Sequence, residues 1–255
     1  MRTLIIVAAL ILAAVGGYAF KEFAVARNDT ASEVPSLTQD QVNQAIGQYL
    51  KDHPEEIVAS LQAAQDKVEQ QKQLAANQAL TDGYAEIFNN AADPVLGNPA
   101  GDVTVVEFFD YRCPYCKRVT DSLTSLIDGD ANVRVVFKEF PILGPESLVA
   151  ARVALAAHKQ GKYREVHEAL MAHKGSFEKD ALIEVAAGVG ADPAKLVADM
   201  EDPAIMTQIQ ANDALAARLG ITGTPGFIFG RTLVPGAISL DDMKKLVAEA
   251  RAKAG

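Results

Sequence analysis

The motif Cys113-Pro114-Tyr115-Cys116 constrains the fold of this chain more than any other feature, because of the segments on either side of it. The apolar run 103–109 precedes it and is typical of a buried strand, and residues 117–127 follow it with helical spacing. The two thiols therefore lie where a strand meets a helix. A cysteine at the start of a helix faces unpaired backbone N–H groups and the positive end of the helix dipole, and both stabilise a thiolate.

Cys113 and Cys116 are the only two cysteines, so no separate disulfide can stabilise the fold. A single Cys-x-x-Cys can be a redox pair, half of a metal site or a small structural staple, and the strand-to-helix placement favours the redox pair. The histidines have no spacing that would complete a metal site with the cysteines, and we expect them on exposed helix surfaces. We predict no metal and no cofactor other than the redox-active disulfide. The histidines are His53, His158, His167 and His173.

The overall charge argues against one class of partner. The chain has 24 Lys and Arg against 33 Asp and Glu, a net charge of -9, and no basic stretch that could follow a phosphate backbone. We therefore expect no nucleic-acid partner. A hydrophobic content of 49% in 255 residues is enough for a sizeable core.

The N-terminus predicts export. Residues 4–20 carry no charge and are almost entirely apolar, and a small-x-small sequence at residues 24–26 offers a cleavage site. The length of this run lies between that of the apolar core of a signal peptide and that of a membrane-spanning helix. Residues 1–26 are therefore interpreted as a signal peptide or a membrane anchor. Either one places the rest of the chain in the periplasm, soluble after cleavage or tethered by residues 4–20. An oxidising periplasm suits a working dithiol.

Residues 34–84 predict a helical segment that either spaces or oligomerises the chain. Residues 37–50 have amphipathic spacing, and residues 55–80 contain neither Gly nor Pro. The longer helix carries a coiled-coil-like apolar seam that is too weak to hold a helix alone, so we expect it to have a partner. The alternative is a solvated spacer. The seam residues are Ile57, Leu61, Ala64 and Val68.

Residues 85–255 predict one α/β domain. Residues 86–88 are interpreted as a short edge strand, residues 89–102 as turns, and residues 103–140 as a β-α-β unit with parallel strands. The segment from about residue 145 to about residue 220 is then predicted to be an all-helical insertion. Its predicted helices are 148–160, 163–173, 181–188, 193–200 and 203–219, and they are followed by strands at 226–229 and 231–234 and a helix at 240–253.

This order of elements, with Gly223-Thr224-Pro225-Gly226 after the insertion, resembles the DsbA-type form of the thioredoxin fold. The resemblance implies a thioredoxin fold with an all-helical insertion, preceded by the extended N-terminal helical segment. It also implies that Pro225 is a cis-proline that lies against the active-site disulfide. Three further segments resemble the ScsC-like branch of that family, namely residues 97–102, 106–111 and 140–144.

The resemblance extends to the N-terminal segment through residues 44–50 and His53-Pro54-Glu55. Some ScsC-like proteins oligomerise through that region. The resemblance implies periplasmic thiol–disulfide exchange, with isomerase activity in oligomeric members and simpler oxidation or reduction in others. ScsC-like proteins also belong to a copper-tolerance context, and two thiolates can hold Cu(I), so copper binding is an alternative function.

The site residues follow from these patterns. We expect Cys113 to be the nucleophile, because it comes first at the helix N-terminus, and Cys116 to resolve the mixed disulfide. Pro114 is pre-set for the first helical position. Tyr115 adds less positive charge than a histidine would, so we predict a couple less oxidising than that of a Cys-Pro-His-Cys enzyme.

Glu107 lies six residues before Cys113, where DsbA-type proteins place an acidic residue beneath the active site. It could relay a proton to Cys116, or it could be a strand-end carboxylate paired with Lys138 or solvent. Thr224 and Pro225 are expected to offer a backbone edge to a client strand. The charged neighbours of the motif are interpreted as solvated surface residues, and they are Asp110, Arg112, Lys117 and Arg118.

The function predicted from the sequence is periplasmic disulfide exchange through Cys113 and Cys116, with isomerisation as the preferred activity. The alternatives are a monomeric disulfide oxidase or reductase and a Cu(I)-binding copper-tolerance protein. The predicted partners are exported client proteins with cysteines, a membrane redox protein that resets the dithiol, and further copies of this chain in a homo-oligomer.

Overall fold

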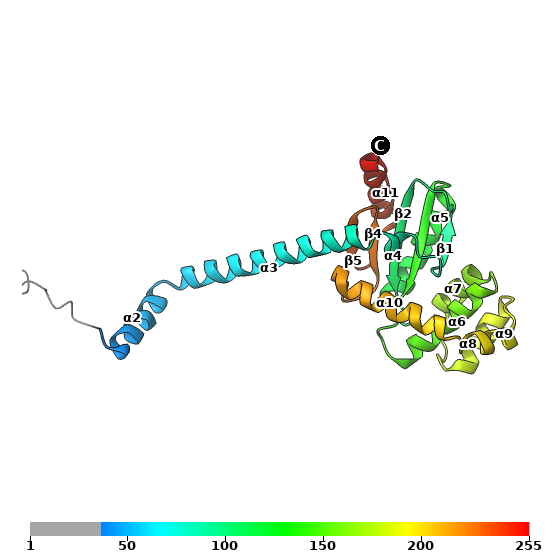
Figure 1. Cartoon of the computed structure of the whole chain (residues 1–255), viewed down its shortest axis with the longest axis horizontal. Coiled ribbons are helices and arrows are strands. Elements are labelled where there is room, and N and C mark those ends of the chain that lie inside the picture. Colours follow the sequence, from blue (N-terminus) through cyan, green and yellow to red (C-terminus); the bar gives the residue numbers. More distant parts are fainter. Residues whose placement is uncertain (1–36, 255) are drawn as a thin grey trace, which may run out of the picture. The chain divides into compact units, whose positions relative to one another are not determined.

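The computed structural model describes residues 37–254 (Figure 1). Packing divides the chain into two units, Met1–Gln65 and Asp66–Gly255, and the boundary falls inside helix α3. The signal or anchor predicted at residues 1–26 lies outside the described residues. Between residues 37 and 254, none of the helices combines the length and the apolar character that crossing a bilayer requires.

The first unit contains helix α2 (Gln39–Asp52) and the start of α3 (Pro54–Asp82). A capping box begins α2: the Thr38 hydroxyl accepts a hydrogen bond from the N–H of Gln41, and the Gln41 side chain accepts one from the N–H of Thr38. Pro54 is the first residue of α3. A backbone N–H at this position has no partner within the helix, so proline, which lacks it, is well tolerated there. Within the described part of the chain, no α2 side chain is buried.

A five-stranded sheet with the order β1-β3-β2-β4-β5 forms the centre of the second unit. The two central strands are parallel, as the sequence predicts, and every other pair is antiparallel. Both central strands are almost wholly buried, which explains their continuous apolar sequences. The strands are β1 (Val95–Gly97), β2 (Val103–Phe109), β3 (Val133–Glu139), β4 (Gly226–Phe229) and β5 (Thr232–Pro235).

Helices cover both faces of the sheet. On one face, Val105 and Phe109 of β2 belong to the core that also contains residues of α5 (Pro114–Gly129) and α11 (Leu240–Ala254). On the other face, Val106 and Phe108 belong to a second core with the end of α3, helix α4 and the end of α10. The bounds of the latter two helices are Tyr84–Phe88 and Pro203–Leu219.

The helical insertion follows β3 and is formed by α6 to α9, after which α10 leads back to the sheet (Figure 1). Its first helices share the apolar core of α5, so the insertion packs directly on the part of the domain that carries the cysteines. The bounds are α6 (Pro145–Lys159), α7 (Tyr163–Ala172), α8 (Lys179–Gly188) and α9 (Pro193–Asp199).

Two expectations about the segment before the motif are wrong. Residues 86–88, interpreted as a strand, lie in α4, where the N–H of Gly83 bonds to the carbonyl of Ala79 and helical structure continues. The segment 89–102, interpreted as turns alone, contains β1, which pairs with β3. Gly97 ends β1 with φ +80°, and a Cβ there would lie 2.5 Å from the carbonyl oxygen of Val133.

Candidate functional site

Cys113 caps the N-terminus of α5. Strand β2 ends at Phe109, a short turn follows, and the N–H of Cys113 donates to the carbonyl of Asp110 at 3.0 Å. Pro114 occupies the first turn of the helix, and the carbonyl of Cys113 accepts the N–H of Lys117 at 3.1 Å. The local sequence therefore places the first thiol at the positive end of the helix dipole.

The two sulfurs differ in their surroundings. Both cysteines are free thiols; 4% of the surface of Cys113 is exposed, and Cys116 has none. Burial raises the pKa of the Cys116 thiol, and the nearby Glu107 raises it further, whereas a hydrogen bond with the backbone of Asp110 opposes the shift. Cys116 is thus held as a thiol until a base removes its proton.

The cis-proline loop meets the first thiol. The Thr224–Pro225 peptide is cis, in the position that the resemblance implies. The Sγ of Cys113 donates to the carbonyl oxygen of Thr224 at 3.3 Å, which joins two residues 111 positions apart in the sequence. The fold therefore brings Cys113, Thr224 and Pro225 together.

Glu107 lies buried in the middle of β2, with 2% of its surface exposed. In the described part of the chain, its Oε1 is the buried side-chain atom that has no hydrogen-bond partner. Burial raises the pKa of this carboxyl from 4.5 to about 8. The pairing with Lys138 that the sequence offered as an alternative is wrong, because the Lys138 ammonium binds the carboxylate of Asp93 and the carbonyl of Glu86.

Asp110 is not the surface charge that the sequence suggested, because it is 1% exposed. Its Oδ1 accepts hydrogen bonds from the N–H of Arg112 and the hydroxyl of Ser147, both at 2.8 Å, and its Oδ2 accepts the N–H of Leu143 at 2.9 Å. The Arg112 guanidinium reaches outward to Glu146 at 2.7 Å. Only the position of Asp110 beside the motif could have identified it from the sequence.

Four buried polar side chains form a second cluster, which the sequence analysis missed. The hydroxyls of Tyr111 and Tyr163 donate to Oε1 of Glu139 at 3.1 and 3.0 Å, and Tyr111 also meets Nδ1 of His167 at 3.0 Å. The expected exposure of His167 is wrong, since it is buried, and burial lowers its pKa to about 3. The cluster joins the active-site turn to β3 and α7.

The residues after the motif divide between surface and interface. Arg118 is exposed, as expected, and stacks on the ring of Tyr115, with its guanidinium carbon 4.3 Å from the ring centroid. Lys117 is half-buried, contrary to expectation: its ammonium binds the carbonyl of His173 and lies 5.0 Å from the ring centroid of Phe177. Lys117 therefore fixes α5 to the loop between α7 and α8.

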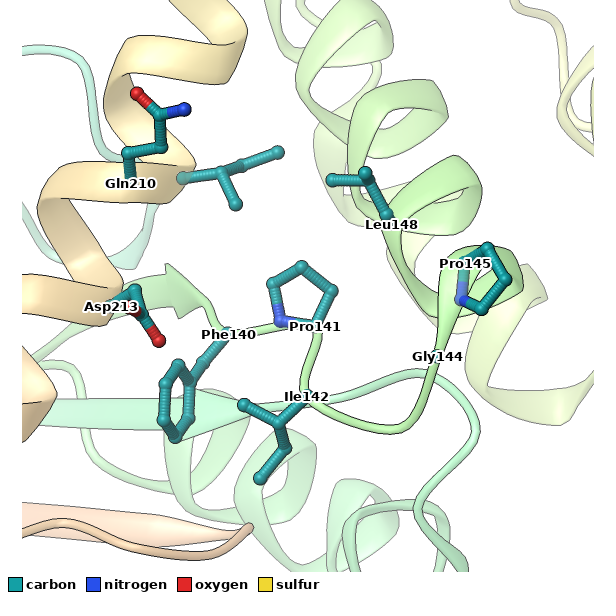
Figure 2. A pocket seen from close by; sticks show the side chains of 9 residues that line it. Phe140, Pro141, Ile142, Gly144, Pro145, Leu148, Gln210 and Asp213 are labelled. Carbon is teal, nitrogen blue, oxygen red and sulfur yellow. The ribbon is translucent and has the colours of Figure 1, made fainter.

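The loop that Asp110 holds also lines a hollow of about 410 Å³. Figure 2 shows Gln210 and Asp213 of α10 across from Leu148 of α6, with Pro141 between them. Among residues 37–254, no group of three or more His, Cys, Asp or Glu side chains is arranged to hold a metal ion. The Cu(I) hypothesis stays a prediction.

Comparisons with known proteins agree with this geometry. A family model described as the DSBA-like thioredoxin domain matches residues 104–248. Among solved structures, a thioredoxin-like oxidoreductase from Silicibacter pomeroyi is 47% identical over 66% of this chain and 97% of that chain, with a TM-score of 0.64. A periplasmic thioredoxin-like protein from Salmonella enterica is 33% identical over 66% and 95%, with a TM-score of 0.62.

The similarity to one solved structure extends well beyond the catalytic domain. A linker-deletion mutant of Proteus mirabilis ScsC is 25% identical over 87% of this chain and 100% of that chain, with a TM-score of 0.70. Among curated relatives, the Na⁺/H⁺ antiporter NhaA 1 of Salinispora arenicola is 31% identical over 62% of this chain. The matched region covers only 24% of the antiporter's length. Together with the dithiol at the cis-proline, these matches show that the chain belongs to the DsbA-like thioredoxin-domain family and is ScsC-like.

Proposed function

We propose that this chain is an exported thiol–disulfide oxidoreductase that works through Cys113 and Cys116. The observation that carries the proposal is the contact between the Sγ of Cys113 and the carbonyl of Thr224 at the cis-proline. The reactive thiol lies beside a backbone edge that a client strand can pair with by main-chain hydrogen bonds, which demand no particular client sequence.

In the reductive direction, the Cys113 thiolate attacks one sulfur of a client disulfide. A bond forms between Cys113 and that sulfur, the client S–S bond breaks, and the other client sulfur leaves as a thiolate and takes up a proton. Cys116 then loses its proton and attacks the Sγ of Cys113. The Cys113–Cys116 disulfide forms as the bond between Cys113 and the client breaks, and the released client sulfur takes up a proton. The client leaves with two thiols, and the protein has lost two electrons. Oxidation of a client is the same sequence in reverse.

Glu107 is the proposed proton acceptor for Cys116. It is buried, its charge affects the Cys116 thiol, and its carboxyl has a pKa of about 8, so that it exchanges protons near neutral pH. Lys138 does not neutralise it, since its ammonium is bound to Asp93. Pro114 and Tyr115 complete the loop, and the exposed Tyr115 ring lies on the surface that a client approaches.

Isomerisation is the proposed activity, with a monomeric oxidase or reductase as the alternative. Isomerisation needs repeated attacks on one client, and several active sites in one assembly keep that client at a high effective concentration. The apolar side chains on α2 and α3 support self-association, because they are large and exposed. They are Ile46, Tyr49, Leu50, Ile57, Val58, Leu61, Val68 and Leu74.

A periplasmic location is part of the proposal. It is supported by the N-terminal sequence and by the likeness to the periplasmic Salmonella protein. The clients would be exported proteins with cysteines, and a membrane redox protein would return the dithiol to its starting state. Residues 4–20 would either be removed or tether the chain to the inner membrane.

Trapping of the mixed disulfide tests the function. With a disulfide-containing client, Cys116→Ala should accumulate a covalent adduct that dithiothreitol reverses, because the resolving thiol is gone. Cys113→Ala should form no adduct and should lose both insulin reduction and the recovery of scrambled ribonuclease. A Cys113→Ala protein that keeps the wild-type rates would contradict the proposal. Activity on insulin without recovery of ribonuclease would favour the reductase.

A further inference from the structure

Asp110 is in contact with both residues of the dithiol through its main chain. Its carbonyl accepts the N–H of Cys113 at 3.0 Å, and its backbone also hydrogen-bonds the Cys116 thiol. The residue therefore fixes the turn that places both sulfurs. No step of the exchange described above uses its side chain.

The side chain of Asp110 is anchored as firmly as its backbone. Its three hydrogen bonds come from three places: Arg112 in the active-site turn, Leu143 in the loop after β3, and Ser147 at the start of α6. A buried carboxylate that accepts three hydrogen bonds is held in one position. The active-site turn is thus fixed to the first helix of the insertion by one side chain.

The carboxylate of Asp110 also belongs to the turn that leads into Cys113. Oδ1 accepts the N–H of Arg112, the residue directly before Cys113. The carboxylate therefore lies beside the N-terminus of α5, whose positive end favours the Cys113 thiolate. Two negative charges there repel each other, and the repulsion exists only in the reduced protein. The guanidinium of Arg112 points away to Glu146 and the carbonyl of Leu143.

We propose that Asp110 is a positioning residue for Cys113 and that its buried charge makes the dithiol more reducing than the Cys-Pro-Tyr-Cys motif alone would. The proposal rests on the disulfide exchange proposed above. Two other carboxyl groups interact electrostatically with the same region. Glu139 interacts with Asp110, and Glu107 interacts with Cys116. Asp110 differs from both because its hydrogen bonds link it to the backbone around Cys113.

The test compares Asp110→Asn with Ser147→Ala in the full chain. The first variant removes the charge, and the second removes one hydrogen bond to the same oxygen but keeps the charge. The readout is the equilibrium constant with reduced and oxidised glutathione. Asp110→Asn should shift it about ten-fold towards the reduced protein, or about 30 mV, whereas Ser147→Ala should stay within two-fold of wild type. Both variants should lose thermal stability.

Two outcomes would overturn the inference. In one, both variants are destabilised but keep the wild-type equilibrium constant. In the other, both shift it equally, so that the lost hydrogen bond and not the charge is responsible. Wild-type protein that exchanges no disulfide with glutathione would overturn the proposed function, and this inference with it.

A second measurement applies if Asp110→Asn does not fold. The carboxyl carbon of Asp110 can be assigned in wild-type protein by its ¹³C shift change in Ser147→Ala. Its resonance should differ between the oxidised and the reduced protein, because only the reduced form places a thiolate beside it. The same shift in both states would overturn the inference.

Discussion

Glu107 has its carboxyl group in a place where water does not reach it and where one of its oxygens has no partner. Its pKa of about 8 means that the folded protein keeps a proton on it at a pH where the unfolded chain has already lost that proton. Folding is therefore penalised increasingly as the pH rises from about 4.5 to about 8. The carboxyl of Glu107 is thus buried beneath the dithiol although its burial lowers the stability of the fold. A group with such a shifted pKa is suited to proton transfer.

Glu107→Gln should remove this penalty. In the oxidised protein, the free energy of unfolding of wild type should fall between pH 5 and pH 8.5, by at most about 5 kcal/mol, and the variant should lack most of that fall. Denaturant titrations at several pH values measure it. The exposed Glu184→Gln is the matched control and should follow the wild type.

The same variant tests the proton relay. Glu107→Gln should slow the resolution of the mixed disulfide by Cys116 and flatten the pH dependence of that step. Exchange rates that match wild type at every pH would show that Glu107 is not the proton acceptor.

At the residue scale, the sequence predicted the groups whose chemistry is local. The positions of Cys113 and Pro114 at a helix start follow from a strand, a turn and a helix in succession. The cluster around Glu139 does not, because Tyr111 lies 28 residues before Glu139 and Tyr163 lies 24 residues after it. His167 lies 56 residues after Tyr111. Burial of such groups depends on packing that a single sequence does not display.

One buried ion pair holds several elements together. The Lys138 ammonium of β3 binds the carboxylate of Asp93, and neither side chain is exposed. Lys138 also donates to the carbonyl of Glu86 in α4, and the amide of Gln208 in α10 donates to Asp93 at 3.1 Å. Burial raises the pKa of Asp93 and lowers that of Lys138, and each charge opposes the shift of the other. The pair lies on the face of the sheet away from the thiols.

Asp93→Ala should destabilise the domain by roughly 3–5 kcal/mol, because it leaves the Lys138 ammonium buried without its partner. Glu165→Ala, which breaks the half-exposed pair with Lys162, should cost no more than about 1 kcal/mol. Unfolding curves of the oxidised proteins compare the two. Equal losses would mean that Lys138 finds solvent or another acceptor in the variant.

At the element scale, the periodicity of the chain predicted most helices and strands to within a few residues. The two failures have one cause. Residues 86–88 and 95–97 are too short to show a period, so α4 and β1 are determined by what they pack against. Ile87 and Phe88 are buried side by side on a single helical turn, whereas alternation in a strand would have separated them.

At the scale of the whole molecule, helix α2 has an apolar side without a covering surface within the described chain. Ile46, Tyr49 and Leu50 are each about half exposed, although a lone helix in water gains nothing from such residues. The long helix α3 after it is compatible with an assembly of several chains. Sequence spacing predicted the amphipathic helix, but a single chain cannot give the number of copies.

Ile46→Glu should reduce the mass of the protein in solution to that of a monomer, because a charge would be introduced into the proposed contact. Light scattering measures the mass. The variant should keep insulin reduction and lose the recovery of scrambled ribonuclease. Gln44→Glu makes a comparable change on the opposite side of α2 and should leave mass and activity unchanged. A wild-type protein that is already a monomer would contradict the oligomer.

The contact between Cys113 and Thr224 has a consequence for the order of events. The Thr224 carbonyl can accept the S–H of a resting thiol, but a thiolate or a mixed disulfide has no proton to offer it. The carbonyl therefore loses this donor when the sulfur becomes nucleophilic, and the amide of an incoming polypeptide can take its place. Docking and activation would thus share a single oxygen atom, for which the resting thiol competes with the amide of a client.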